Sequence, residues 1–174
     1  DARAVVHAHP PAIVSYSLTR TAPNTEIIPA PNTVIGNVGI AEYEVPGSIK
    51  LGENIAKIFA QGCNAVLMEN HGVVTCGEDV FTAFERFETL EYCAELNIQS
   101  SKLGKAVVLG KDQLELFKTR SEATLGEFTV KERTSEEKEL RYTMCNLMKR
   151  AYHKKLVTST HGTFSQRLKG NDSF

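Results

Sequence analysis

The hydrophobic and polar positions of this chain switch between two periods. Short apolar runs of the kind found in buried strands occur at four places, residues 4–9, 35–45, 65–68 and 73–75. Apolar residues spaced by three and four positions predict helices over residues 11–18, 49–61, 80–103, 111–120 and 135–153. Strands and helices therefore alternate, which predicts an α/β fold but leaves the order of the strands open.

Three further segments carry weaker patterns. Residues 21–33 are rich in proline, asparagine and threonine, which predicts a loop with one short extended piece at Ile27 and Ile28. Residues 121–133 are charged and have little apolar pattern, so we interpret them as a linker at a domain boundary. Thr134 precedes the last helix in a sequence that resembles a capping box, and residues 156–168 predict a turn leading into a strand.

Two histidines share one face of the first predicted strand. Side chains alternate between the two faces of a strand, so His7 and His9 point the same way, with the small Ala8 between them. Pro10 has no N–H for a sheet ladder and is expected to end the strand. The pair could bind a metal ion, or it could be two hydrogen-bonded core histidines.

A third histidine follows the strand predicted at residues 65–68. His71 belongs to the segment Glu69-Asn70-His71-Gly72, and Gly72 permits a turn or a close backbone approach. Zinc and related ions prefer three or four ligands, and neutral imidazole is among the favoured ones. His71 is therefore the candidate third ligand, and the alternative is a core histidine at a bend.

Five glutamates raise the question of a catalytic carboxylate. Glu69 lies two residues before His71 and shares its face if the strand continues that far, which suggests a proton carrier or a partner of a metal ligand; the alternative is a surface residue. Four more line the long helix and are expected to face solvent or another subunit: Glu85, Glu88, Glu91 and Glu95.

Composition narrows the function classes. The 174 residues are 41% hydrophobic and 24% charged, which are ordinary values for a globular domain. The net charge of −1 and the lack of an apolar run near ~20 residues predict no nucleic-acid and no membrane partner. The four cysteines are Cys63, Cys76, Cys93 and Cys145, and none form a C-x-x-C pair. Because Cys63 and Cys93 lie in apolar patterns, we expect reduced, buried thiols and a cytoplasmic location rather than a disulfide framework.

The two histidine motifs at this separation resemble the class II aldolase/adducin family over about residues 1–104. The resemblance implies a three-layer α/β/α fold with a mainly antiparallel central sheet. It also implies that His7, His9 and His71 bind Zn²⁺ or another divalent first-row metal. The implied activity is that of a lyase, a metal-dependent aldolase that cleaves a small sugar phosphate reversibly through a zinc-stabilised enediolate. Members are usually homo-oligomers, mostly tetramers.

The same superfamily also includes proteins with other functions, which are alternatives to the aldolase activity. Adducin-like members keep the fold as a structural or assembly module without catalysis, and others are epimerases or dehydratases. The family's acid–base carboxylate lies in a segment before the H-x-H strand, so we expect the isolated chain to be inactive.

The end of the chain resembles the beginning of the same module. In the family, an opening helix leads to a segment whose threonine, glycine and asparagine help to hold the substrate phosphate, and the matching positions are Thr160, Gly162 and Thr163. Thr163 replaces the usual asparagine. We therefore expect residues 1–120 to be the metal-binding later part of one module, 121–133 a linker and 134–174 the start of a second. The simplest expectation is a piece of a longer tandem protein, and the alternative is a circular permutation.

Overall fold

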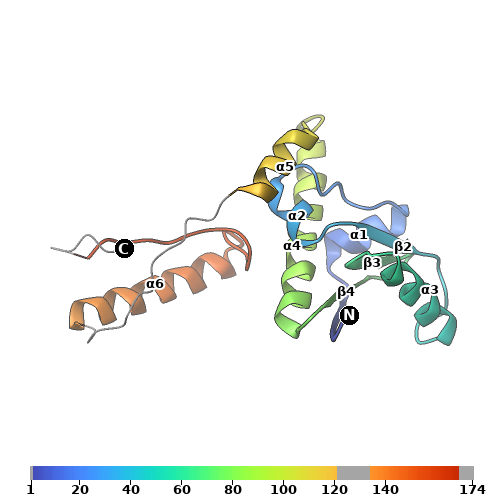
Figure 1. The fold of residues 1–174 in the computed structure, drawn as a ribbon, viewed down its shortest axis with the longest axis horizontal. Helices are drawn as coiled ribbons and strands as arrows, with labels where there is room; N and C mark the ends of the chain where they lie inside the picture. Colours follow the sequence, from blue (N-terminus) through green and yellow to red (C-terminus); the bar gives the residue numbers. More distant parts are fainter. Residues whose placement is uncertain (1, 121–133, 169–174) are drawn as a thin grey trace. The chain divides into compact units, whose positions relative to one another are not determined.

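The computed structural model describes residues 2–120 and 134–168, and the chain divides into two units, residues 1–120 and 121–174. The elements of the first unit follow in the order β1 (Ala4–Ala8), α1 (Pro11–Thr19), α2 (Pro29–Val34), β2 (Val38–Ala41), α3 (Ile49–Ala60), β3 (Ala65–Met68), β4 (Val73–Gly77), α4 (Val80–Leu103) and α5 (Lys111–Thr119) (Figure 1). The second unit contains α6 (Ser135–His153).

The four strands form one sheet in the order β1-β4-β3-β2. β4 pairs antiparallel with both β1 and β3, whereas β2 pairs parallel with β3. The α/β expectation is confirmed, but the expected mainly antiparallel sheet needs correction, because this sheet is mixed. The reason is the connection: α3 carries the chain from β2 back to the start of β3, and such a crossover produces a parallel pair.

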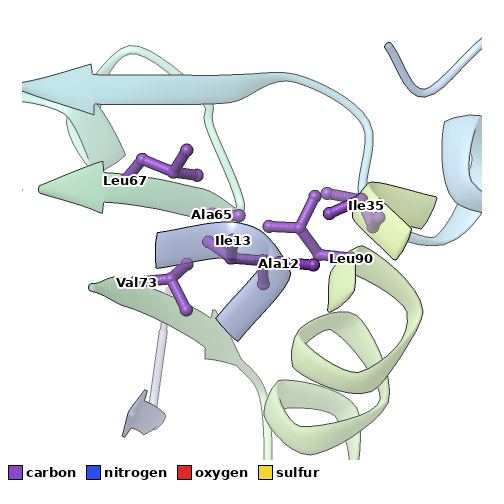
Figure 2. Packing of buried hydrophobic residues seen from close by; sticks show 8 residues of the cluster. Ala12, Ile13, Ile35, Ala65, Leu67, Val73 and Leu90 are labelled. Atoms are coloured by element: carbon purple, nitrogen blue, oxygen red, sulfur yellow. The ribbon is translucent and has the colours of Figure 1, made fainter. Parts of the chain in front are cut away.

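Helices cover both faces of the sheet. Successive residues of the central strands point to opposite sides, and because these residues are buried throughout β3 and β4, both faces are covered. Ala65 and Leu67 of β3 join Ile13 of α1 and Leu90 of α4 in one cluster, and Figure 2 shows these side chains gathered between the strands and the two helices. The alternate β3 residues pack with Leu51 of α3 on the other face. β3 is thus buried throughout, and the unit has three layers.

Two local expectations in the first unit are wrong. Residues 29–34 form the short helix α2 rather than a loop, since proline suits a first helical turn as well as a loop. β2 is shorter than residues 35–45. Gly39 lies within it, and a Cβ there would overlap the side chain of Ile58, so the glycine allows α3 to approach the strand.

The second unit contains one helix and an irregular segment among its described residues. Oγ1 of Thr134 accepts a hydrogen bond from the N–H of Glu137 at 3.1 Å, which confirms the N-cap half of the expected capping box. The strand expected within residues 156–168 is wrong: these residues form a turn and irregular coil. A strand needs a neighbour for its backbone groups, and the described part of this unit offers none.

The expected linker, residues 121–133, lies outside the described residues. Across the described helices, none is both long and apolar enough to cross a membrane.

Candidate metal centre

The end of β1 presents two imidazoles on one face. Exposure alternates along β1, and His7 and His9 are both exposed, as their spacing predicts. Nδ1 of His7 lies 2.9 Å from the carbonyl oxygen of Val73. Because a carbonyl only accepts, this contact is a hydrogen bond only when Nδ1 carries the proton, and Nε2 then keeps its lone pair for a ligand.

A tight turn between β3 and β4 brings the third imidazole to the same place. The N–H of Met68 donates to the Gly72 carbonyl at 2.8 Å, and the N–H of His71 donates to the Met68 carbonyl at 3.1 Å. Asn70 takes a left-handed conformation (φ 55°), which asparagine tolerates better than most residues. β1 pairs with β4 up to Ala8 opposite Val73, so the turn lies beside the end of β1.

The three rings form a compact cluster. Ring centroids are 4.8 Å apart for His7 and His9, 5.2 Å for His7 and His71, and 4.9 Å for His9 and His71. One potential ligand atom from each ring lies within 4.8 Å of the other two. The tertiary structure therefore gathers all three histidines that the two motifs single out.

The cluster fits a divalent first-row ion. Nδ1 of His71 is buried and has no hydrogen-bond partner in the described structure, which is costly for a polar atom that binds nothing. Three imidazoles suit zinc among other ions, and three protein ligands leave a coordination position open.

Burial also keeps His71 in the form that binds metals. Desolvation lowers the pKa of His71 below its ordinary value, and the neighbouring His7 and His9 lower this pKa further. Only the neutral imidazole has a free lone pair, so the lowered pKa favours the ligand form at neutral pH.

The sign of this pKa shift predicts a pH dependence of the metal-free protein. The folded state takes up the His71 proton at lower pH than the unfolded chain, so this contribution to stability is complete above about pH 6.5 and is lost as the pH falls toward the lowered pKa. Denaturation at several pH values should show a steeper loss below about pH 6.5 for the wild type than for His71→Gln. Parallel pH profiles for the two proteins would contradict this prediction.

Gly72 allows the turn to approach the end of β1. A Cβ at this position would lie 2.7 Å from the carbonyl oxygen of Ala8 and 2.8 Å from Cδ2 of His9. Because the first of these atoms belongs to the backbone, Gly72→Ala must displace either the turn or β1.

We therefore expect Gly72→Ala to weaken binding of Zn²⁺ about 10-fold or more, as measured by competition with a chelating dye. Gly52→Ala is the matched control, because a Cβ at Gly52 in α3 meets nothing within 4 Å. Equal zinc affinity in the two variants would show that the close approach is unimportant for the site.

Glu69 does not follow the strand-alternation argument. β3 ends at Met68, before this residue, so Glu69 and His71 are not on one continuous strand. The Glu69 carboxylate accepts a hydrogen bond from the N–H of Tyr43 at 3.1 Å, and it lies 3.6 Å from Nε of Arg20. It is not a member of the cluster of potential ligands. Its catalytic role stays a prediction that strand alternation does not support.

Glu91, one of the four acids of α4 that were expected to face solvent or another subunit, instead contacts α1. Oε1 and Oε2 of Glu91 accept hydrogen bonds from the backbone N–H groups of Ala12 and Ile13, at 3.0 and 2.9 Å. The sequence contains one signal for such a contact, because a helix that opens with Pro10-Pro11 has no serine, threonine, aspartate or asparagine to cap it. Which acceptor replaces the cap is not readable from the sequence.

The candidate phosphate-binding residues lie in the second unit. Thr160 is half-buried, and its hydroxyl lies 2.9 Å from Nδ1 of His161; Gly162 and Thr163 are exposed. The turn is closed by a hydrogen bond of 3.0 Å from the Thr158 N–H to the His161 carbonyl. Their role with a substrate stays a prediction.

Known proteins resemble a large part of this chain, and the family model among them includes the histidine cluster. The family model described as the Class II Aldolase and Adducin N-terminal domain matches residues 1–98. The L-fuculose phosphate aldolase of Methanococcus maripaludis is 30% identical over 107 residues, covering 59% of this chain and 54% of that protein. The 3-oxo-tetronate 4-phosphate decarboxylase of Haemophilus influenzae is 34% identical over 109 residues, covering 59% and 51%.

A solved structure agrees with these relatives. An L-fuculose 1-phosphate aldolase superposes with a TM-score of 0.59 at 32% identity, covering 67% of this chain and 54% of that chain. The chain thus spans about half the length of the curated relatives that it matches. Because the family model matches more than half of the 174 residues and includes all three clustered histidines, the chain belongs to the class II aldolase and adducin family.

Proposed function

We propose that residues 1–120 form the metal-binding part of a class II lyase that cleaves a small sugar phosphate by a reversible aldol reaction. The observation that carries the proposal is the cluster of His7, His9 and His71, whose potential ligand atoms lie within 4.8 Å of one another. The relatives named as sugar-phosphate aldolases support the substrate class and the reaction.

In this proposal the three imidazoles hold Zn²⁺ or another divalent first-row ion. Such an ion supplies Lewis-acid stabilisation of negative charge on substrate oxygens, on the order of several kcal/mol. The chain prepares the site for it: the Val73 carbonyl orients the ring of His7, and burial keeps His71 neutral. His7 and His9 are exposed, so a small molecule can reach the cluster from solvent.

We also propose that residues 134–174 are the start of a second module of the same kind. In such a module, Thr160, Gly162 and Thr163 bind the phosphate group of the substrate. Backbone N–H groups and hydroxyls donate hydrogen bonds to phosphate oxygens, and these residues offer both. Thr163→Ala, compared with Ser165→Ala as a neighbouring hydroxyl, tests this assignment through the KM for the phosphorylated substrate.

Decarboxylation is the second candidate, favoured by the 34% identical relative named as a 3-oxo-tetronate 4-phosphate decarboxylase. Aldol cleavage and decarboxylation both break a carbon–carbon bond and leave electrons that a nearby cation can stabilise. The metal cluster alone therefore supports both reactions, and the substrate decides between them.

The deciding experiment begins with the metal-to-protein ratio by elemental analysis. It continues with assays of the protein that carries this chain on L-fuculose 1-phosphate and on 3-oxo-tetronate 4-phosphate. We expect about one ion per chain, as three clustered histidines predict, and aldol cleavage that a chelator abolishes. Carbon dioxide release from the second substrate alone would establish the decarboxylase instead. A protein without metal and without either activity would support the adducin-like scaffold.

We also propose that the protein is a cytoplasmic homo-oligomer, a tetramer. All four cysteines are unpaired, as expected for a reducing compartment, and burial raises the pKa of Cys93 to about 12, which keeps that thiol protonated.

Light scattering after size exclusion tests the proposed tetramer, and a monomer at micromolar concentration would contradict it.

A further inference from the structure

The first turn of α1 has no cap in its own sequence. Pro10 occupies the N-cap position and makes no side-chain hydrogen bond, and Pro11 follows at the first helical position. Neither proline has an N–H, so the first donors of the helix are the N–H groups of Ala12 and Ile13. Both residues are buried, with 7% and 0% of their surfaces exposed, so water cannot readily satisfy these groups.

Glu91 satisfies both donors from a different helix. One carboxylate oxygen accepts from Ala12 and the other from Ile13, at 3.0 and 2.9 Å. The carboxylate is well suited to this place, because hydrogen bonds to an ionised acceptor are strong and negative charge is favoured at a helix N-terminus. Figure 2 shows Ala12 and Ile13 beside Leu90, the residue before Glu91 on α4. The two helices are therefore joined where α1 begins.

This junction begins at Ala12, only a short distance along the chain from the candidate ligand His9. The β1–β4 register ends with Ala8 opposite Val73, so His9 is outside the paired part of the strand. Its backbone continues through Pro10 directly into the turn that Glu91 holds. His71, against which the His9 ring stacks at 4.9 Å, lies in the turn before β4, and β4 leads into α4. Glu91 thus links the chain segments that follow the two imidazoles.

We propose that Glu91 is a positioning residue for the histidine cluster. By holding the first turn of α1 against α4, its carboxylate keeps the His9 imidazole beside His7 and His71. The inference rests on the proposed metal site. Glu91, which the sequence predicted to face solvent or another subunit, here helps to fix the positions of the three imidazoles.

The test uses the full chain and the variant Glu91→Gln. The amide offers one acceptor oxygen, and its NH₂ group cannot accept from the second N–H. We expect the affinity for Zn²⁺, measured by competition with a chelating dye, to fall about 10- to 100-fold, as is typical when support of a metal ligand is lost. Glu85→Gln removes the same charge from the same helix without changing the contacts of Ala12 and Ile13, and its affinity should equal that of the wild type.

A spectroscopic readout separates positioning from loss of stability. The visible absorption of bound Co²⁺ depends on its coordination geometry, so each spectrum is normalised to the bound ion. Partial unfolding lowers the amount of bound Co²⁺ and leaves this spectrum unchanged, whereas a displaced His9 alters it. If Glu91→Gln does not fold, Glu91→Asp keeps both oxygens on a shorter side chain and should show a smaller change in the same direction.

The outcomes distinguish the inference from the proposed function. A wild-type chain that binds neither Zn²⁺ nor Co²⁺ would overturn the metal site and this inference together. A wild type that binds one ion, with unchanged affinity and spectrum in Glu91→Gln, would overturn only the positioning role. Weaker binding with an altered spectrum, absent in Glu85→Gln, supports it.

Discussion

Replacing His71 with alanine is expected to abolish stable binding of a divalent ion. His71 is one of three imidazoles whose potential ligand atoms lie within 4.8 Å of one another, and its buried Nδ1 has no hydrogen-bond partner in the described structure. Two remaining imidazoles are fewer than the three protein ligands typical of catalytic zinc. The affinity for Zn²⁺ should fall by more than the roughly 10- to 100-fold that loss of a supporting contact causes.

Elemental analysis after dialysis measures this effect directly. The wild type should retain about one ion per chain, as a site with three ligands predicts, and His71→Ala should retain almost none. His153→Ala is the control, because His153 is an exposed imidazole at the last position of α6. Full zinc content in His71→Ala would show that the ligand assignment is wrong, provided that circular dichroism confirms the same fold.

The second large effect concerns the core rather than the site. Leu90 of α4 is completely buried and packs in the cluster that joins the sheet to α1 and α4. Leu90→Ala removes buried methyl groups and leaves a cavity, so the free energy of unfolding should fall by about 2–5 kcal/mol. A loss of that size is a large part of the total stability of a typical domain, about 5–15 kcal/mol.

The same helix supplies the control for this prediction. Leu103 is 93% exposed, and Leu103→Ala should change the free energy of unfolding by less than about 0.5 kcal/mol. Urea denaturation followed by circular dichroism measures both variants. Similar midpoints for Leu90→Ala and Leu103→Ala would mean that the interface between α4 and the sheet contributes little to stability.

Several features that depend on local geometry were predicted well, although the short helix α2 and the length of β2 were not. The alternation of a strand places His7 and His9 on one exposed face of β1, and the structure confirms it. The helix predicted over residues 80–103 matches α4 (Val80–Leu103). Its N-cap Asp79 accepts a hydrogen bond from the N–H of Thr82 at 2.7 Å. Such features involve residues only a few positions apart, so a short stretch of the sequence contains every residue that takes part in them.

Features that depend on distant partners were predicted poorly. The strand expected within residues 156–168 has no strand to pair with among the described residues of its unit. Glu69 was placed by alternation beside His71, but β3 ends before it and its carboxylate contacts Tyr43 and Arg20 instead. Glu91 was expected on an outer face and caps a helix almost 80 positions away. Sequence periodicity contains no information on such pairs.

The sequence by itself indicated His7, His9 and His71 as candidate ligands. It determined the face on which His7 and His9 lie, because the backbone geometry of a strand sets that period. It also determined the family, through two motifs that the family model includes. Only the tertiary structure decided that the turn at His71 lies beside the end of β1 and that Glu91 holds the start of α1. Both depend on strand register and helix packing between segments far apart in the chain, where many pairings satisfy the same local pattern and burial of one shared core selects among them.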